Sequence, residues 1–431
     1  MTSPRRLDRI AAAVAGLSVS WALPAHAQGR PCAPPTDVPK QLALPSESTE
    51  GRWLLGPGVG VGLGLAGAAA LACGPPGIAR PALKDLVLGA GDELGVDAEI
   101  ALVFTTRPLA CGNIYYVPLA NDVRGIGYRH ADGHDVFDDT PGRRLEGVAF
   151  LNDWPYWQPR PEELDSALLH EVGHRWAARV HARVGDRVTA ALLGREGNHW
   201  SYFLDSGGSP LEGNVWRATS SGQTSDTPRD PRRFSALDLY LMGLLPPGEV
   251  PPLELLIAAP TEATDCAGND LAADSPPQTC VALELDAERV TVPIEDVIAA
   301  EGPRLPAASD APRSIGVLPL VLQSSAEPWS AAECEALALA VHEGLDAFER
   351  ATQGGLSVQN VLAEGMRCEA IQRASSADDA AEPVAPALPA ARPSCTASRQ
   401  PRSGWHVAAW LVLACAWRRR GSRPAGSPRG R

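Results

Sequence analysis

Hydrophobic and polar positions form patterns that predict a folded region from about residue 83 onwards. Leu83–Leu94 carries apolar residues at helical spacing, and Ile100–Thr105 is a continuous apolar run of strand length. Ile114–Leu119 and Gly147–Leu151 have the same strand-like character. The pattern therefore predicts one helix and three strands in the first third of the chain.

The most strongly helical stretch runs from Pro161 to Val184. Acidic residues fill its first turn, and Gly185 follows its last residue. Proline at the first helical position, early acids and a glycine just past the end are the boundary signals of a helix. The segment after it, up to about Arg233, is rich in turn residues and predicts loops.

Three further segments complete the pattern. Ser235–Leu245 predicts a short helix that two prolines stop, and Val317–Leu322 predicts a strand. Ser330–Thr352 predicts a final helix, in which Ser330 and Glu333 have the spacing of a capping box.

An uncharged stretch of twenty residues, Leu54–Cys73, is long enough to span a membrane. Six of those residues are glycines, which are poor helix formers. We interpret the stretch as an irregular or strand-like buried segment, with a membrane anchor as the alternative.

The N-terminus has the organisation of an export signal. Basic residues precede an apolar run from Ile10 to Leu23, and Ala25-His26-Ala27 follows it. A basic region, an apolar region and a small-residue cleavage site predict a secretory signal peptide over residues 1–27.

The C-terminus combines Cys395, the apolar stretch His406–Trp417 and the cluster Arg418-Arg419-Arg420. Twelve helical residues span roughly 18 Å, less than the ~30 Å hydrocarbon core of a bilayer. The order of cysteine, apolar stretch and arginine cluster resembles the tripartite sorting tails of the MYXO-CTERM type. This resemblance implies transient membrane association followed by display or release at the cell surface. A hydrophobic C-terminus without a sorting role is the alternative.

Composition and charge narrow the classes of function. Hydrophobic residues make up 45% of the 431 residues, enough for a buried core, while 40 prolines and 41 glycines indicate many turns. The net charge is −13, and basic residues are concentrated at the two ends. The acidic part between them would repel nucleic acid and anionic lipid, so no nucleic-acid partner is expected.

The nine cysteines contain no C-x-x-C pair, so a cysteine zinc site is not expected. Disulfides fit an oxidising compartment. Proximity along the chain suggests three pairs, although connectivity cannot be derived from sequence. The suggested pairs are Cys73–Cys111, Cys266–Cys280 and Cys334–Cys368, with Cys32 left over.

The long helical segment contains His170-Glu171-Val172-Gly173-His174, an H-E-x-x-H pattern. Four residues turn a helix by about 400°, so both imidazoles project from one face and can reach a single zinc ion at ~2.0–2.1 Å. Glu171 lies beside the first ligand and can act as a general base towards a zinc-bound water. Zinc lowers the pKa of that water to about 7 and polarises the scissile carbonyl. Two histidines without metal are the alternative.

This pattern resembles the zincin superfamily of zinc metallopeptidases. The resemblance implies an α+β fold, with a zincin-like domain that has a mixed sheet and a long active-site helix. It also implies a strand that binds the extended substrate backbone by edge pairing, for which Gly147–Leu151 is the candidate. Protein or peptide substrates follow from the same resemblance.

The third zinc ligand is less well defined. The metzincin pattern H-E-x-x-H-x-x-G-x-x-H fails, because Ala177 and Val180 stand where the glycine and the third histidine should be. A helix that continues to His181 would place this histidine about 16 Å from His170 along the axis.

Asp238 is the provisional third ligand, because it is a carboxylate in an otherwise apolar short helix. The alternative is an early-helix acid favoured by the helix dipole. His199 and Glu212 are further ligand candidates. Tyr240 could donate a hydrogen bond to the tetrahedral oxyanion, in an arrangement that loosely resembles the aspzincin Asp and Tyr.

These inferences together predict a secreted or cell-surface zinc endopeptidase. Two alternatives stay open: a cell-surface binding or structural protein with a degenerate protease fold, and a zinc hydrolase that does not cleave peptides. The expected organisation is a signal peptide (1–27), a Pro/Gly-rich segment (28–79), a zincin-like catalytic region (80–250), a loop-rich, disulfide-braced C-terminal region (251–372), a linker (373–394) and the sorting tail (395–431).

Overall fold

The computed structural model describes residues 53–55, 60–62, 76–106, 114–129, 133–218, 223–225, 232–258, 264, 269–277, 284–285, 287–322 and 329–362. The predicted signal peptide, linker and sorting tail lie outside these residues. Within them, no helix has both the length and the apolar character needed to cross a membrane.

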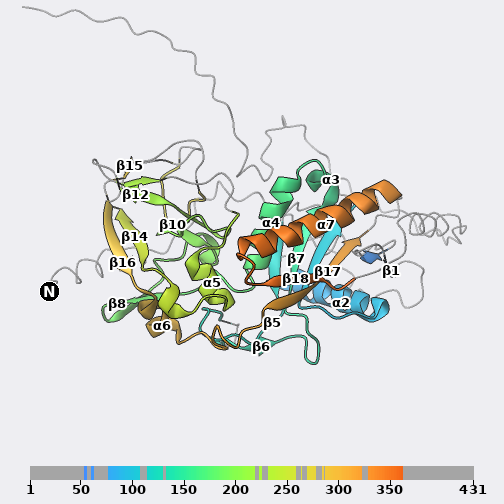
Figure 1. Cartoon of the computed structure of the whole chain (residues 1–431), viewed down its shortest axis with the longest axis horizontal. Coiled ribbons are helices and arrows are strands. Elements are labelled where there is room, and N and C mark those ends of the chain that lie inside the picture. The colour runs from blue at the N-terminus through green and yellow to red at the C-terminus, as the bar shows by residue number, and fades with distance from the viewer. Residues whose placement is uncertain are drawn as a thin grey trace, which may run out of the picture.

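A seven-stranded mixed sheet forms the centre of the fold (Figure 1). Its order is β1 (Trp53–Leu55), β2 (Gly60–Gly62), β17 (Ser314–Leu322), β3 (Ile100–Thr105), β7 (Gly147–Asp153) and β4 (Tyr115–Pro118), and β18 (Ser357–Asn360) also pairs with β17. The pairs that β17 forms with β2, β3 and β18 are parallel, as is the β3–β7 pair. Strand β4 runs antiparallel to β7 at one edge, and β1 runs antiparallel to β2 at the other.

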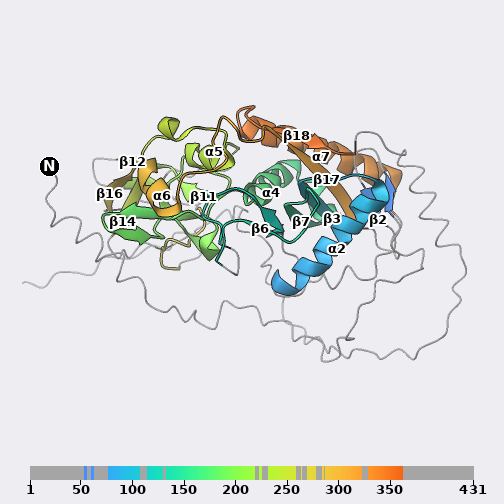
Figure 2. The ribbon, with the colours of Figure 1, turned by 90° about the horizontal axis from the view of Figure 1, so that it is seen from below.

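Helices cover both faces of this sheet. Helix α2 (Pro76–Leu94) packs against one face, where Ala101 and Val103 of β3 lie in the same buried cluster as Leu83. The alternate residues of β3, such as Leu102, lie in a second cluster with α4 (Pro161–Gly173) and α7 (Ala331–Ala351). Figure 2 shows the sheet strands between α2 and α7. A strand buried on both faces needs the continuous apolar run that β3 has.

A smaller part of the molecule lies beyond α4, at the left of Figure 1. Its four-stranded sheet has the order β11 (Glu212–Asn214), β10 (Trp200–Asp205), β14 (Leu253–Ala258), β16 (Ala287–Val292). The remaining elements there are β8 (Ala182–Val184), β9 (Arg187–Thr189), η2 (Arg195–Gly197), β12 (Trp216–Ala218), β13 (Gln223–Ser225), α5 (Ala236–Met242), η3 (Pro247–Glu249), β15 (Glu284–Leu285) and α6 (Ile294–Glu301). Two short strands, β5 (Ala120–Asn121) and β6 (Phe137–Asp138), form a separate pair, and α3 (Trp154–Trp157) leads into α4.

Helices and mixed sheets confirm the predicted α+β class. Among the single elements, β3, β4, β7 and β17 coincide with the predicted strands, and α2 includes the predicted helix over Leu83–Leu94. Both predicted later helices are present, and each begins with a complete capping box. The region expected as a C-terminal extension contributes β17 to the middle of the central sheet.

The helix predicted over Pro161–Val184 is shorter than expected, because α4 ends at Gly173. The side chains of Tyr128 and Arg179 donate hydrogen bonds to the carbonyl of His174. They thereby satisfy a carbonyl at the end of the helix, while the buried Arg175 side chain pairs with Glu146. Tertiary contacts therefore override the helical propensity of the segment that follows.

Two further predictions are corrected. Strand Gly147–Leu151, the proposed substrate-pairing strand, lies between β3 and β4, so both of its backbone edges are already paired. The segment predicted as loops up to Arg233 contains β10, whose Trp200 and Tyr202 are fully buried. Packing, which a single-sequence pattern does not show, decides both cases.

Each predicted disulfide pair includes at least one cysteine outside the described residues. Cys334 is buried in α7 and disulfide-bonded, but the other eight cysteines lie outside the described residues.

The close approach of Gly127 to the segment after α4 leads to a stability prediction. Gly127 has φ +76°, and a Cβ there would lie 2.3 Å from the Arg179 carbonyl oxygen. Gly142 has φ +79° with nothing near its Cβ position, so Gly142→Ala isolates the cost of the left-handed backbone, about 1–2 kcal/mol. We expect Gly127→Ala to cost roughly 1–3 kcal/mol more in urea unfolding. Equal losses for the two variants would contradict the close packing.

Candidate metal centre

Helix α4 presents the first two histidines of the site. Proline occupies its first turn together with Glu162 and Glu163, as helix starts favour. Leu164, Leu168 and Val172 are buried on the side of the helix that contributes to the main core. The backbone amide of His174 still donates to the carbonyl of His170, 3.3 Å away, so the helical spacing of the motif extends through both histidines.

His199 completes a cluster of three histidines. It lies just before β10, and its Nε2 is 3.1 Å from Nε2 of His170. Nε2 of His174 is 3.2 Å from the same His170 atom. Among the described residues, these three histidines form the only group whose ligand atoms lie close enough together to hold a metal ion. The site thus forms where the central sheet's helix meets the smaller sheet.

The hydrogen bonds of the rings fix which nitrogen carries the proton. Nδ1 of His170 lies 2.8 Å from the carbonyl oxygen of Pro210, and Nδ1 of His199 lies 3.0 Å from that of Arg195. A carbonyl only accepts hydrogen bonds, so in the neutral rings Nδ1 carries the proton and Nε2 a lone pair. The Nδ1 atom of His174 is buried without a partner among the described residues.

Facing lone pairs at such short distances fit a cation between them. Tetrahedral zinc with bonds of ~2.0–2.1 Å separates its ligand nitrogens by about 3.3 Å, close to the observed 3.1 and 3.2 Å. Three protein ligands leave a fourth position for water or substrate, as in catalytic zinc sites. His170, His174 and His199 could therefore hold a metal ion, and their spacing fits zinc.

Burial keeps these histidines neutral. It lowers the pKa of His170 to about 4 and that of His199 to about 2, and in both cases the positive charge of Arg195 lowers it further. The pKa of His174 is also held well below its usual value by burial and by the two neighbouring histidines. Neutral imidazole is the form that binds metal ions.

Glu171 is buried next to His170 in α4. Burial raises the pKa of its carboxyl group to about 8, and the charge of Arg195 opposes this rise. Because Arg195 also contacts His199, Glu171 and the histidines share one electrostatic environment. A carboxyl group with a pKa near neutrality is well suited to general base catalysis.

Asp238 does not join the histidine cluster. Its Oδ1 accepts a hydrogen bond from Nε1 of Trp200 at 2.8 Å, and its Oδ2 accepts one from the amide of Ser235, also at 2.8 Å. The Ser209 side chain also hydrogen-bonds to this fully buried carboxylate. The structure therefore places His199, and not the predicted Asp238, beside His170 and His174, and Asp238 is the acceptor that holds three segments around the site.

Tyr240 and Glu212 also have definite places. The Tyr240 hydroxyl accepts a hydrogen bond from the amide of Arg304, 3.2 Å away, in the core beside α5, so the structure gives no support to an oxyanion role. Glu212 is buried 3.9 Å from Nε2 of His199 but lies outside the ligand group. Its carboxylate instead binds the side chain of Arg195.

The signal that could have favoured His199 lay in the capping pattern of α5. Ser235 and Asp238 have the S-x-x-[DE] spacing of a capping box, and the structure shows both of its hydrogen bonds. A capping role for the acid leaves histidine, a common zinc ligand, as the better candidate. No local pattern marks Arg195.

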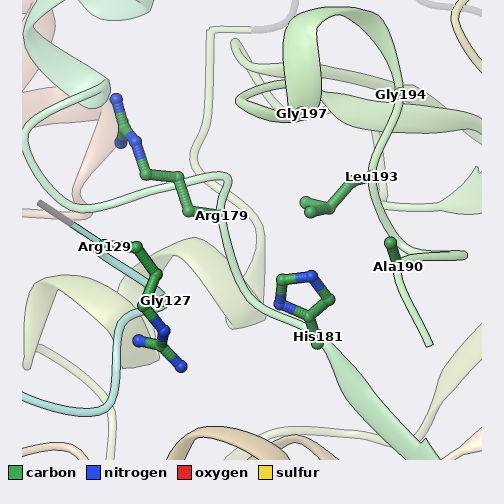
Figure 3. A pocket seen from close by; sticks show the side chains of 8 residues that line it. All are labelled: Gly127, Arg129, Arg179, His181, Ala190, Leu193, Gly194 and Gly197. Atoms are coloured by element: carbon green, nitrogen blue, oxygen red, sulfur yellow. The ribbon is translucent and has the colours of Figure 1, made fainter. Parts of the chain in front are cut away.

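A cavity of about 450 Å³ adjoins this region (Figure 3). The His181 ring points towards Leu193 in it, whereas the Arg179 guanidinium points away from both. His181, considered as a late metzincin ligand, hydrogen-bonds through Nδ1 to Glu301 at 2.8 Å. Gly194 and Gly197 also line the cavity, on either side of Arg195.

No protein-family model, curated protein sequence or solved structure matches this chain.

The role of Asp238 can be separated from that of a ligand. We expect Asp238→Ala to cost about 3–5 kcal/mol of unfolding free energy, because it leaves buried donors without their acceptor. Glu333→Ala is the matched control, since it removes the equivalent capping-box acid from α7 at a cost of about 1 kcal/mol. Loss of metal from Asp238→Ala at unchanged stability would restore Asp238 as a ligand.

The shifted pKa values predict opposite pH effects for two substitutions in the metal-free protein. Unfolded His199 binds a proton below about pH 6.5 but the folded form does not, so this residue makes the wild type less stable as the pH falls from 7 to 5. The folded Glu171 is protonated below about pH 8, whereas its unfolded form is not until about pH 4.5, so it makes the wild type more stable over the same range.

Urea unfolding at pH 7 and 5 measures both effects. Relative to His199→Gln, the wild type should lose about 1–2 kcal/mol on acidification, and relative to Glu171→Gln it should gain about as much. His342→Gln, at an exposed position of α7, is the control for removal of a histidine outside the cluster. The same sign for both site variants would contradict the neutral-histidine arrangement.

Proposed function

We propose that this protein is a zinc-dependent endopeptidase. The observation that carries the proposal is the convergence of the Nε2 atoms of His170, His174 and His199. A bound zinc ion would lower the pKa of a water molecule and polarise a peptide carbonyl. The protein's own groups would do the rest of the chemistry.

Glu171 is the proposed general base. It would take a proton from the attacking water and later deliver it to the leaving amine. Its burial supports this role, because a carboxylate in a dry site is a stronger base than one in water. Zinc ligation itself falls to the histidines, whose Nδ1 partners orient two of the three rings.

Substrate would be held by the surfaces around the site. Strand β4 is antiparallel at the edge of the described central sheet and packs near α4, so it takes the place of β7 as the strand for pairing with an extended peptide. The cavity of about 450 Å³ has the size of a small-molecule or side-chain pocket. We propose that sheet, α4 and β4 together form a zincin-type catalytic domain.

Export and surface display belong to the proposal through the sequence of the two ends. The signal peptide over residues 1–27 and the sorting tail over residues 395–431 support a secreted or outer-surface location. Protein substrates outside the cell are the corresponding partners.

Zinc content and proteolysis test the proposal on the chain that begins at residue 28, oxidised and folded. We expect one zinc per chain by atomic absorption and cleavage of casein. Glu171→Gln should retain zinc and lose about 100- to 10,000-fold in rate. His199→Ala should lose zinc, whereas the control His181→Ala, outside the ligand group, should keep it.

Other outcomes would support the alternatives. Zinc without peptide cleavage would favour a hydrolase of another class. A folded protein without zinc or activity would favour the cell-surface binding protein, because the arrangement of the three rings would then serve no metal.

A further inference from the structure

The side chain of Arg195 lies against the metal-binding face of the histidine cluster. Its Nη2 is 2.9 Å from Nε2 of His199, the same atom that lies 3.1 Å from Nε2 of His170. Its charge also lowers the pKa values of His170, Glu171 and His199.

This contact sets up a competition. Guanidinium is a donor without any acceptor atom, so the contact uses the lone pair of His199 Nε2. A metal ion on His199 would need the same lone pair. Arg195 must then give up this contact, and its freed N–H group remains beside the site for another acceptor.

Glu212 holds Arg195 in place. Its Oε1 accepts hydrogen bonds from Nη2 at 2.6 Å and from Nε at 3.2 Å of Arg195. Glu212 is 4% exposed, and its Oε2 is buried without a partner among the described residues. Its backbone has φ +73°, a conformation that costs free energy for a residue with a side chain.

The Arg195–Glu212 ion pair would cost more free energy than it contributes if its only role were to stabilise the fold. Burying a carboxylate carries a desolvation cost that one partner rarely repays. The partner, moreover, is a half-exposed arginine with 41% of its side chain accessible, so the pair is not a packed core element. Strain and buried charge of this kind concentrate at functional sites.

We propose that Arg195 binds the carbonyl oxygen of the scissile peptide bond and stabilises the negative charge that develops there, and that Glu212 is its positioning residue. This inference rests on the proposed peptidase function. It assigns to Arg195 the role that the sequence suggested for Tyr240.

The electron balance of the step shows why a cation is needed. A water oxygen bonds to the carbonyl carbon, its proton passes to Glu171, and the π pair of the carbonyl moves onto the oxygen that Arg195 binds. The pair then returns as the C–N bond breaks, and the leaving nitrogen takes the proton from Glu171. The products are a carboxylic acid and an amine, and no further reactant is required.

Removal of the Arg195 charge should have opposite effects on metal binding and catalysis. Arg195→Met removes a competitor for the lone pair of His199, so the zinc Kd, measured by chelator competition, should become about 10-fold lower. The same change should lower kcat about 100- to 1,000-fold with KM within about threefold, as loss of an oxyanion donor does. A structural role would instead weaken zinc binding and activity together.

The experiment compares the oxidised wild type from residue 28 with Arg195→Met, Arg195→Lys and Glu212→Gln. Arg232→Met is the control, because Arg232 has a similarly exposed side chain and pairs with Glu162 instead. Lysine should restore part of kcat, and Glu212→Gln should lower kcat about 10-fold while zinc stays bound. A phosphinic analogue of a casein-derived peptide that the wild type cleaves provides a second measurement. Its affinity should fall in Arg195→Met by about the same factor as kcat.

Three results would overturn the inference. If the wild type cleaves peptides and Arg195→Met keeps both kcat and phosphinic affinity within threefold, the inference alone fails. If Arg195→Met lost both zinc and activity, the role of Arg195 would be structural and the inference would fail. A wild type that cleaves nothing would remove the proposed function and this inference with it.

Discussion

The geometry of the histidine cluster depends on a carboxylate that does not belong to it. Asp238 is fully buried and receives hydrogen bonds from Trp200, from Ser209 and from the backbone at the start of α5. Trp200 directly follows His199, and the residue after Ser209 supplies the carbonyl that orients the His170 ring. Because each donor would be left buried and unsatisfied if the carboxylate moved, one acceptor fixes the positions of two rings that come from different parts of the chain.

Local signals in the sequence were sufficient for much of the fold. The strand over Ile100–Thr105 and the capping box of Ser330 and Glu333 are properties of short segments, and the structure confirms both. The end of α4 could not be predicted in this way, because the turn after it makes contacts with distant residues, such as the pair between Arg175 and Glu146, 29 positions earlier. Strand β7 has the same apolar pattern whether it lies at an edge or in the interior, so its pairing with β4 was not readable either.

The candidate site likewise contains residues that local sequence predicts and residues that only contacts between distant segments bring together. His170 and His174 were found because helical spacing alone places their rings together. His199 reaches them only through the approach of the smaller sheet to α4, which involves contacts between distant parts of the chain. The sequence suggests Asp238 as a ligand because a carboxylate buried in an apolar helix requires a partner. Its partners proved to be the hydrogen-bond donors of Trp200 and of the cap of α5.

In this site, a metal ion and the positively charged Arg195 would compete for the same histidine lone pair. Neutral histidines offer lone pairs to a cation, while the cation already present, Arg195, occupies the lone pair of His199. Glu212 holds Arg195 beside the site through a hydrogen bond and is itself buried. A divalent ion that displaced the guanidinium from His199 would therefore not expel it from the site, and a positively charged donor would stay beside the candidate ligands and Glu171. Such a fixed donor needs no reorganisation when negative charge appears on a substrate oxygen, as the proposed peptide hydrolysis would require.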